Sequence, residues 1–350
     1  MDYFSILQLE TEPFSNSPDP AFFFKSRQHQ DCLQKIELAL RLKRGLNVVM
    51  GDVGTGKTTL CRQLIRRFQG DEKIDTHLIL DPGFDTPTEF LATVAEMLSD
   101  RPVAAEGDPW RLKEVIKKSL YKRAVDEERT IILIFDEGQK LPAFAIELLR
   151  ELLNYETNTE KLLQIAIFAQ CEFETVLAAQ SNFADRINLL HRLEPMSFRD
   201  TREMIRFRLR QSSASPKPLP LFTYPATWAI YRFSRGYPRK IIHLCHQSLL
   251  TMIIQNRTKA GLLLVRSCVQ RAISHPGRRL WRPLTTLLLL LLAAVTVAVL
   301  LPEPYAPLSH LASGWRSRPW VSVYPVGNPE GSQTTADPPA GTNSHNATKA

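Results

Sequence analysis

The stretch Gly51-Asp52-Val53-Gly54-Thr55-Gly56-Lys57-Thr58-Thr59 decides the fold. An apolar run (46–50) precedes it and an amphipathic run (60–65) follows it, so the order is strand, glycine loop, helix. Glycines let successive backbone N–H groups face an anion, and the positive end of the following helix adds to the attraction. The alternative is a glycine-rich turn with a chance lysine, but the complete pattern in this context predicts a site for a nucleoside triphosphate.

ATP and Mg²⁺ are the cofactors that this loop predicts. We expect all nine residues of the stretch, Gly51 to Thr59, to line the nucleotide. Lys57 would reach the β- and γ-phosphates, and the hydroxyl of Thr58 would hold the magnesium ion.

An acidic pair completes the predicted site. Residues 130–135 form a continuous apolar run, typical of a parallel strand buried on both faces, and the run ends in Asp136 and Glu137. Asp136 is predicted to contact the magnesium ion, and Glu137 to polarise the water that attacks the γ-phosphate. The alternative is a surface acidic pair at a strand end. The position after an apolar strand and downstream of the glycine loop favours ATP hydrolysis.

Four further polar residues are candidates for sensing the phosphates or completing the catalytic group. Gln170 follows another buried apolar run, where it would orient the water or, alternatively, only cap the strand. Arg239 starts a helix after the proline-fixed turn 236–238, and it would report the phosphate state. Arg186 and Arg192 are candidates for an arginine finger that reaches a neighbouring subunit, with a solvated surface charge as the alternative.

The chain has room for about two domains by length. Residues 1–28 are rich in aromatic residues and prolines, which predicts an ordered, non-helical wrap on a neighbouring surface. Strand and helix patterns alternate over 29–196, which indicates an α/β domain with a doubly wound parallel sheet. Only helical patterns follow over 197–275, so we expect a small all-helical domain there.

Composition places the chain among ordinary globular proteins, with 44% hydrophobic and 23% charged residues. The five cysteines form no C-x-x-C pair, which fits reduced thiols in the cytosol better than a disulfide or zinc framework. Cys245-His246 has no second pair to complete a metal site, so packing in the core explains it better.

Residues 284–301 carry no charge and are long enough to cross a bilayer. A buried core helix is the alternative, but we expect no further domain that could cover a uniformly apolar helix. The region 257–282 contains seven Lys or Arg and no acidic residue, whereas the tail, 302–350, is nearly neutral. The positive-inside rule therefore predicts a single membrane pass with the N-terminal side in the cytoplasm, followed by a largely disordered tail.

The motifs together resemble those of AAA+ ATPases, and more closely those of the ExeA-like group, the general secretion pathway protein A family. In that group a segment similar to Tyr3-Phe4…Pro13-Phe14…Pro18-Asp19-Pro20 precedes the P-loop, and similar motifs match residues 135–139, 168–172 and 234–245. The resemblance covers about residues 1–275. It implies a P-loop AAA+ three-layer sandwich with a helical lid, a homo-oligomer (ring or dimer), and a cytoplasmic ATPase domain at the bacterial inner membrane.

The sequence departs from the family pattern at a few positions. The family commonly has Ala where Gly138 stands, Gly and Pro where Ala169 and Cys171 stand, and Asn where Ile242 stands. None of these departures removes a phosphate or magnesium group. Secretion-type members also carry a folded periplasmic domain that binds peptidoglycan, whereas the tail 302–350 is short and rich in proline, so we do not expect cell-wall binding.

Three functions from different classes are consistent with these motifs. The leading hypothesis is a membrane-anchored ATPase that drives or regulates assembly of an envelope secretion, pilus or polysaccharide-export machine. The second is a nucleic-acid-binding ATPase that resembles transposition helpers or initiators and uses the basic region 257–282. The position of those charges next to the apolar stretch makes nucleic acid the less favoured partner. The third is a scaffold that binds ATP with little turnover.

Overall fold

The computed structural model describes residues 7, 9–15, 20–99, 108–215, 219–273 and 291–292. Strands and helices alternate up to residue 193, in the order η1 (Pro20–Phe22), α2 (Arg27–Arg41), β1 (Leu46–Gly51), α3 (Lys57–Phe68), β2 (Ile74–Ile79), α4 (Pro87–Ser99), α5 (Pro109–Tyr121), η2 (Lys122–Asp126), β3 (Thr130–Phe135), η3 (Gly138–Lys140), α6 (Ala143–Leu152), β4 (Leu163–Ala169), α7 (Phe173–Ala179), α8 (Ser181–Ala184) and β5 (Ile187–Leu193). Four helices follow: α9 (Phe198–Gln211), α10 (Tyr224–Ser234), α11 (Pro238–Ile254) and α12 (Leu262–Ile273).

The five strands form one parallel sheet in the order β2-β3-β4-β1-β5. Strand β1 lies between β4 and β5, and Met50 pairs with Ala169 on one side and with Arg192 on the other. Because the carboxyl ends of parallel strands meet at the same edge, the residues that follow β1, β3 and β4 come together there. That edge is where the sequence places the nucleotide.

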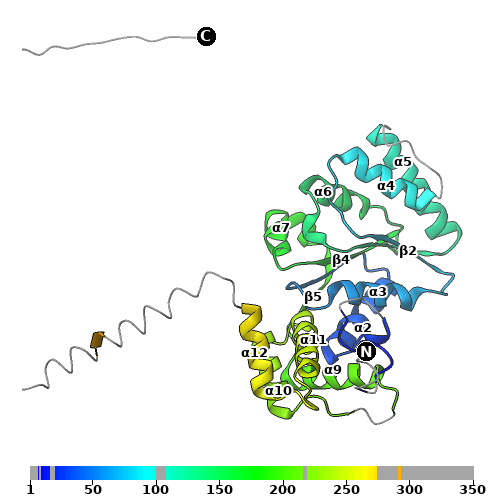
Figure 1. Cartoon of the computed structure of the whole chain (residues 1–350). Helices are drawn as coiled ribbons and strands as arrows, with labels where there is room; N and C mark the ends of the chain where they lie inside the picture. Colours follow the sequence, from blue (N-terminus) through cyan, green and yellow to red (C-terminus); the bar gives the residue numbers. More distant parts are fainter. Residues whose placement is uncertain are drawn as a thin grey trace, which may run out of the picture. The chain divides into compact units, whose positions relative to one another are not determined.

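Helices cover both faces of the sheet, which confirms the predicted α/β layers (Figure 1). Helices α4 to α8 pack on one face in an apolar core with β1, β3 and β4. Helices α2 and α3 cover the other face with a second core that includes Val49, Ile132 and Phe168. The three layers together position the loop between β1 and α3 at the edge of the sheet.

Strand β5 and the short helices α7 and α8 were not predicted from the sequence. The exposure of β5 alternates along its length, because every second residue faces solvent at the edge of the sheet. It therefore lacks the continuous apolar run that marked β3 and β4. Helix α8 has only four residues, too few for a helical period to show.

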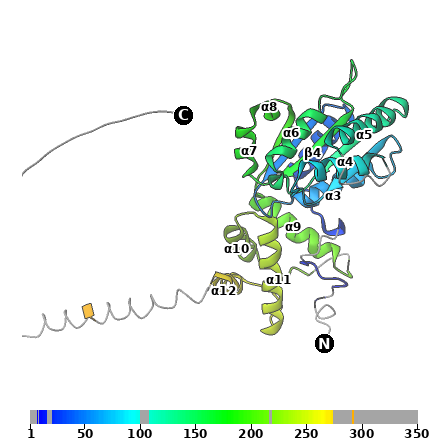
Figure 2. The same ribbon diagram turned by 90° about the horizontal axis from the view of Figure 1, so that it is seen from above.

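Helices α9 to α12 share a separate apolar core with part of the N-terminal segment (Figure 2). Leu7, Leu9 and Phe14 are buried in that core, and the ring of Phe14 meets Phe222 edge-on at 5.9 Å between centroids. Leu9 also forms an isolated β-bridge with Ser213 at the end of α9. These three residues thus pack on the helical bundle, whereas Phe23 packs against the core between α2, α3 and the sheet.

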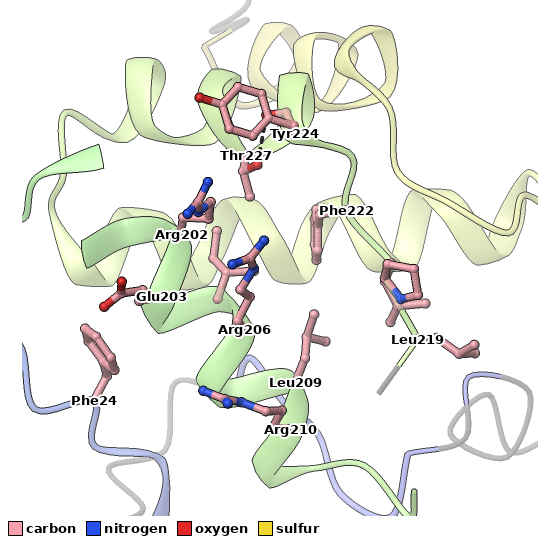
Figure 3. A pocket seen from close by; sticks show the side chains of 13 residues that line it. Phe24, Arg202, Glu203, Arg206, Leu209, Arg210, Leu219, Phe222, Tyr224 and Thr227 are labelled. Atoms are coloured by element: carbon pink, nitrogen blue, oxygen red, sulfur yellow. Dashed lines mark hydrogen bonds between the residues drawn. The ribbon is translucent and has the colours of Figure 1, made fainter. Parts of the chain in front are cut away.

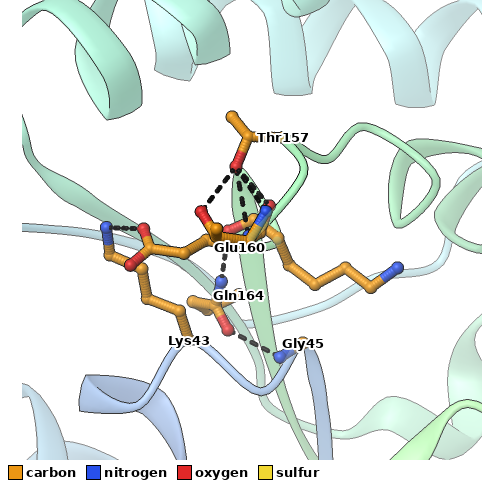
Figure 4. A network of polar contacts seen from close by, with 7 residues as sticks. Lys43, Gly45, Thr157, Glu160 and Gln164 are labelled. Carbon is orange, nitrogen blue, oxygen red and sulfur yellow. Dashed lines mark hydrogen bonds and ion pairs between the residues drawn. The ribbon is translucent and has the colours of Figure 1, made fainter.

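The start of β1, at the opposite end from the glycine loop, is fixed by a polar network (Figure 4). The side-chain oxygen of Gln164 accepts a hydrogen bond from the backbone N–H of Gly45 at 2.6 Å, and its amide nitrogen donates to the carbonyl of Lys161 at 2.8 Å. Lys43 forms an ion pair with Glu160 across the same network. These contacts tie the turn before β1 to the loop before β4.

No helix within the described part of the chain is long and apolar enough to cross a membrane. The predicted span, 284–301, lies outside the described residues except for 291 and 292, as does the whole of the tail 302–350. The membrane pass therefore stays a prediction.

Candidate functional site

The glycine loop joins β1 to α3 and has the backbone geometry that phosphate binding needs. Gly54 and Gly56 have φ values of +84° and +106°, which L side chains rarely adopt. His29 of α2 contacts the backbone of the loop, because its Nε2 lies 3.0 Å from the carbonyl of Thr55. Burial lowers the pKa of His29, so the ring is neutral and donates through Nε2, while its Nδ1 accepts from the hydroxyl of Ser26 at 2.5 Å.

Lys57 occupies the first turn of α3 and folds back on the loop. Its Nζ donates to the carbonyls of Gly51 at 2.8 Å and Asp52 at 3.1 Å. The side chain is buried, and burial lowers its pKa, although the nearby carboxylates of Glu137 and Asp136 act in the opposite direction. A buried ammonium group at this point is a strong attractor for a phosphate anion.

Asp136 lies at the end of β3, buried beside Thr58. Burial raises its pKa, and a hydrogen bond from the Thr58 side chain opposes that effect. The carboxylate also accepts the backbone N–H of Glu137 at 3.1 Å. A hydroxyl and a carboxylate in contact at the mouth of the loop are the oxygen ligands that Mg²⁺ prefers, so the residues present fit a magnesium ion bound with a nucleotide.

Glu137 is held by two glutamines, one of which the sequence did not single out for this role. Gln139 donates to Glu137 Oε2 at 2.5 Å, and Gln170 donates to the same oxygen at 3.1 Å. The glutamines are also joined, because the backbone N–H of Gln170 donates to Gln139 Oε1 at 2.9 Å. Burial raises the pKa of Glu137, but the two side-chain hydrogen bonds and the charges of Lys57 and Lys140 together lower it below its ordinary value. The network keeps this carboxylate ionised and fixes its orientation.

The amino end of α11 sits directly on the glycine loop. The backbone N–H of Arg239 lies 3.4 Å from the carbonyl of Gly54, and a Cβ added at Gly54 would lie 3.0 Å from the Cβ of Arg239. The hydroxyl of Tyr237 donates to Asp52 Oδ2 at 2.6 Å, and this bond lowers the pKa of the Asp52 carboxyl. The helical bundle is thereby joined to the P-loop by one backbone and one side-chain contact.

The two finger candidates lie at opposite ends of β5. Arg192 pairs in register with Met50 at the end of β1, and its Nη1 forms an ion pair with Glu174 at 3.0 Å. Arg186 lies just before β5, at the amino ends of the strands, whereas the P-loop lies at their carboxyl ends. Seven residues of strand place it about 20 Å from the P-loop edge. Arg186 is therefore too far away to contact the nucleotide of its own chain.

Sequence reasoning did not assign roles to three residues that the structure places at the site: His29, Gln139 and Tyr237. Gln139 and Tyr237 stand inside motifs that carried the family resemblance, so a signal for them existed. His29 lies in an ordinary amphipathic helix, and only the folded chain brings it under the loop. A Cβ at Gly138 would lie 2.3 Å from Cγ2 of Ile167, so this position has no room for a larger residue in the observed packing.

Comparison with known proteins identifies the family. The family model described as an AAA domain matches residues 40–177. General secretion pathway protein A of Aeromonas hydrophila is 30% identical over 259 residues, which are 73% of this chain and 46% of that protein. This chain is an AAA+ ATPase related to general secretion pathway protein A. It spans about half the length of that curated relative, at 46%.

Solved structures agree on the fold. ORC2 of Aeropyrum pernix, in its ADPNP–ADP complexes, matches with a TM-score of 0.54 and 16% identity, covering 74% of this chain and 71% of that chain. Cdc6p of Pyrobaculum aerophilum matches with a TM-score of 0.56 and 15% identity, covering 72% of this chain and 69% of that chain. The Drosophila ORC bound to DNA also has a TM-score of 0.56, with 17% identity over 76% of this chain and 67% of that chain. At identities this low, the matches support the fold and say nothing of the function.

Proposed function

We propose that this AAA+ ATPase hydrolyses ATP and uses the nucleotide state to move its helical bundle, as a membrane-anchored part of an envelope secretion, pilus or polysaccharide-export machine. The observation that carries the proposal is the contact of α11 with the P-loop through Arg239 and Tyr237. A triphosphate bound to the loop would lie beside these contacts of Arg239 and Tyr237. Its binding and its hydrolysis would therefore change the strength of the interaction between α11 and the P-loop. The helical bundle would then act as a lid.

Each residue has a defined role in this proposal. Residues 51–59 hold the phosphates, with Lys57 on the β- and γ-oxygens and Thr58 and Asp136 on the magnesium ion. A bound magnesium ion would neutralise charge on the phosphates. Glu137 accepts a proton from the attacking water, since its carboxylate is kept ionised by the two glutamines. Gln170 fixes that carboxylate, and Arg239 senses the phosphate from the bundle.

Arg186 is proposed to act in a neighbouring subunit. Its distance from the P-loop of its own chain leaves that as the way in which it could stabilise the charge of the transition state. This role requires a homo-oligomer in which the start of β5 of one subunit faces the P-loop of the next. Ring and dimer both satisfy that requirement.

Replacing Gln139 by Leu is expected to lower kcat about tenfold with little change in KM, because the carboxylate of Glu137 loses a donor that orients it. The same change raises the pKa of Glu137, since hydrogen bonds from Gln139 and Gln170 hold it down. A base acts only when deprotonated, so the acid limb of the kcat profile should move to higher pH. Phosphate release measured across a pH series checks both effects.

Gln34→Leu is the matched control, because Gln34 is exposed on α2 and lies away from the site. It should leave kcat and the pH profile unchanged. A Gln139→Leu enzyme with normal kcat and an unshifted acid limb would remove Gln139 from this role.

The membrane part of the proposal rests on residues 284–301 and on the seven basic residues before them. The full chain expressed in bacteria should sediment with the membrane fraction and be extracted by detergent, not by salt. A variant with Leu289→Arg and Leu292→Arg should move to the soluble fraction, since each arginine at the centre of a span costs about 3 kcal/mol on the insertion scale. Wild-type protein that stays soluble would contradict the anchor and leave the ATPase proposal standing.

A nucleic-acid-binding ATPase is the second candidate, favoured by the absence of acidic residues between Arg257 and Arg282. The full chain would then bind labelled duplex DNA at about 0.15 M salt, where non-specific contacts are already weakened. Binding to DNA together with absence from the membrane fraction would favour this candidate over the leading one.

A further inference from the structure

A pocket of about 550 Å³ opens in the helical bundle, between α9 and the segment that leads into α10 (Figure 3). Its volume falls in the range of ligand-binding cavities. None of its lining residues belongs to the nucleotide site. The pocket is therefore a separate feature that ATP binding does not explain.

One wall of the pocket is apolar. It is built mainly from Leu219, Leu221 and Phe222. Leu219 is 42% exposed and Tyr224, at the rim, is 60% exposed. Apolar side chains left in solvent around a concavity are typical of a surface that another molecule covers.

The other wall carries a row of arginines. Arg202, Arg206 and Arg210 follow one another at intervals of four residues along α9, so they share one face of that helix (Figure 3). Like charges at this spacing destabilise a helix, so helix stability does not account for the arrangement. The row supplies three planar cations beside an apolar wall.

These three arginines lack acidic partners within the described part of the chain. The acidic residue of the lining, Glu203, is already paired with Arg199 at 3.2 Å. The Nε of Arg202 is buried without a hydrogen-bond partner in the described structure, and its guanidinium lies 5.9 Å over the ring of Tyr224. A buried donor without an acceptor is costly, which points to a ligand that supplies one.

Arg208, on the same helix, differs from the row in that its guanidinium is hydrogen-bonded to the N-terminal segment. It is buried, and its Nη1 donates to the carbonyl of Pro13 at 3.1 Å while its guanidinium lies over the ring of Phe22. That arginine holds the N-terminal segment on the bundle. Arg202 also lies over an aromatic ring, but within the described residues no side-chain hydrogen bond or ion pair engages the arginines of the pocket row.

We propose that this pocket binds an acidic amphipathic segment of a partner protein. An apolar side chain of the segment enters against Leu219 and Phe222, and its carboxylates pair with the arginine row, where the guanidinium geometry permits two hydrogen bonds to each carboxylate. The aliphatic side chains of the lining, Leu219 and Leu221 among them, favour an inserted peptide side chain. The lining also contains aromatic rings, on which nucleic-acid bases stack, so single-stranded DNA is the competing ligand in the test below. Charge complementarity selects an acidic partner over a neutral or basic one.

The test measures binding of a fluorescein-labelled helical peptide to the full-length protein by fluorescence anisotropy. The peptide has glutamate at every fourth position and leucine on the adjacent face, and a second peptide has glutamine in place of each glutamate. The glutamate peptide should bind at least about tenfold more tightly, since ion pairs at a partly desolvated site are stronger than neutral hydrogen bonds. Equal binding of the two peptides, or no binding, would overturn the proposal.

Variants of exposed residues locate the site without threatening the fold. Arg206→Glu should lower the affinity for the glutamate peptide at least about tenfold. Leu219→Ser should lower it about threefold through loss of apolar contact. Arg266→Glu is the matched control, because this exposed arginine of α12 has the same charge and lies outside the pocket lining. An equal loss of peptide affinity in Arg266→Glu would show that the effect comes from net charge alone, and would overturn the proposal.

Single-stranded DNA of the same charge is the competing probe. It should bind wild-type protein no more tightly than it binds Arg206→Glu. DNA binding that depends on Arg206, with no binding of the glutamate peptide, would assign the row to nucleic acid and overturn the peptide proposal.

Discussion

Replacing Glu137 by Gln is expected to lower the rate of phosphate release by about a hundredfold or more while ATP still binds. General-base catalysis contributes about 10²- to 10⁴-fold in enzymes, and an amide cannot accept the proton of the attacking water. Glutamine has nearly the same shape, so it can stay close to Gln139 and Gln170. Phosphate release by the full chain with saturating MgATP measures the fall in the hydrolysis rate. Binding of a fluorescent ATP analogue measures the affinity that the variant retains.

The ionisation of Glu137 makes this prediction specific. The structure places its carboxylate on two side-chain donors, which stabilise the charged form and leave the pKa below the ordinary value. The residue is therefore ready to act as a base at neutral pH. Asp136 next to it is buried beside the Thr58 hydroxyl, and this placement of two oxygen groups suits it to a ligand role. Two neighbouring carboxylates thus acquire different tasks from different surroundings.

Glu72→Gln serves as the control, since Glu72 is an exposed carboxylate in the turn before β2. It should leave both hydrolysis and binding unchanged. Unchanged phosphate release by the Glu137→Gln protein would take Glu137 out of its role. A wild-type rate already as low as that of the variant would favour the scaffold that binds ATP with little turnover.

The sequence predicted the parts of the site that depend on local pattern. The glycine loop, the buried strand before Asp136 and the run before Gln170 each have a signal that reaches no further than a few residues, and the parallel sheet brings their ends together. Strand β5 was not predicted because about half of its residues face solvent, so the pattern of a buried strand was absent. Edge strands with alternating exposure have weak signals in a single sequence.

The rest of the site depends on contacts between distant residues. His29 and Thr55 are 26 positions apart, and Tyr237 and Asp52 are 185 apart. No periodicity or motif spacing encodes such pairs, because they form only when the layers of the domain pack. The distance of Arg186 from its own P-loop is of the same kind: its position in the chain did not reveal which edge of the sheet it occupies.

Replacing Lys57 by Ala is expected to weaken ATP binding about 10- to 100-fold. Hydrogen bonds to charged groups are worth about 1.5–3 kcal/mol, and the Nζ of Lys57 would make such bonds with the phosphates. Within the described residues this buried ammonium is bonded to the carbonyls of Gly51 and Asp52, so the phosphate would replace neutral acceptors with a charged one. Titration of the fluorescent ATP analogue into the full chain measures the loss.

Thermal unfolding gives an independent check on the same residue. A ligand that binds only the folded state raises stability in proportion to the logarithm of its concentration over Kd. MgATP should therefore raise the melting temperature of the wild type and of Lys118→Ala, an exposed lysine of α5, but have little effect on Lys57→Ala. Normal ATP affinity in Lys57→Ala would overturn the assignment of the loop itself, because Lys57 is the lysine that the glycine-loop pattern assigns to the phosphates.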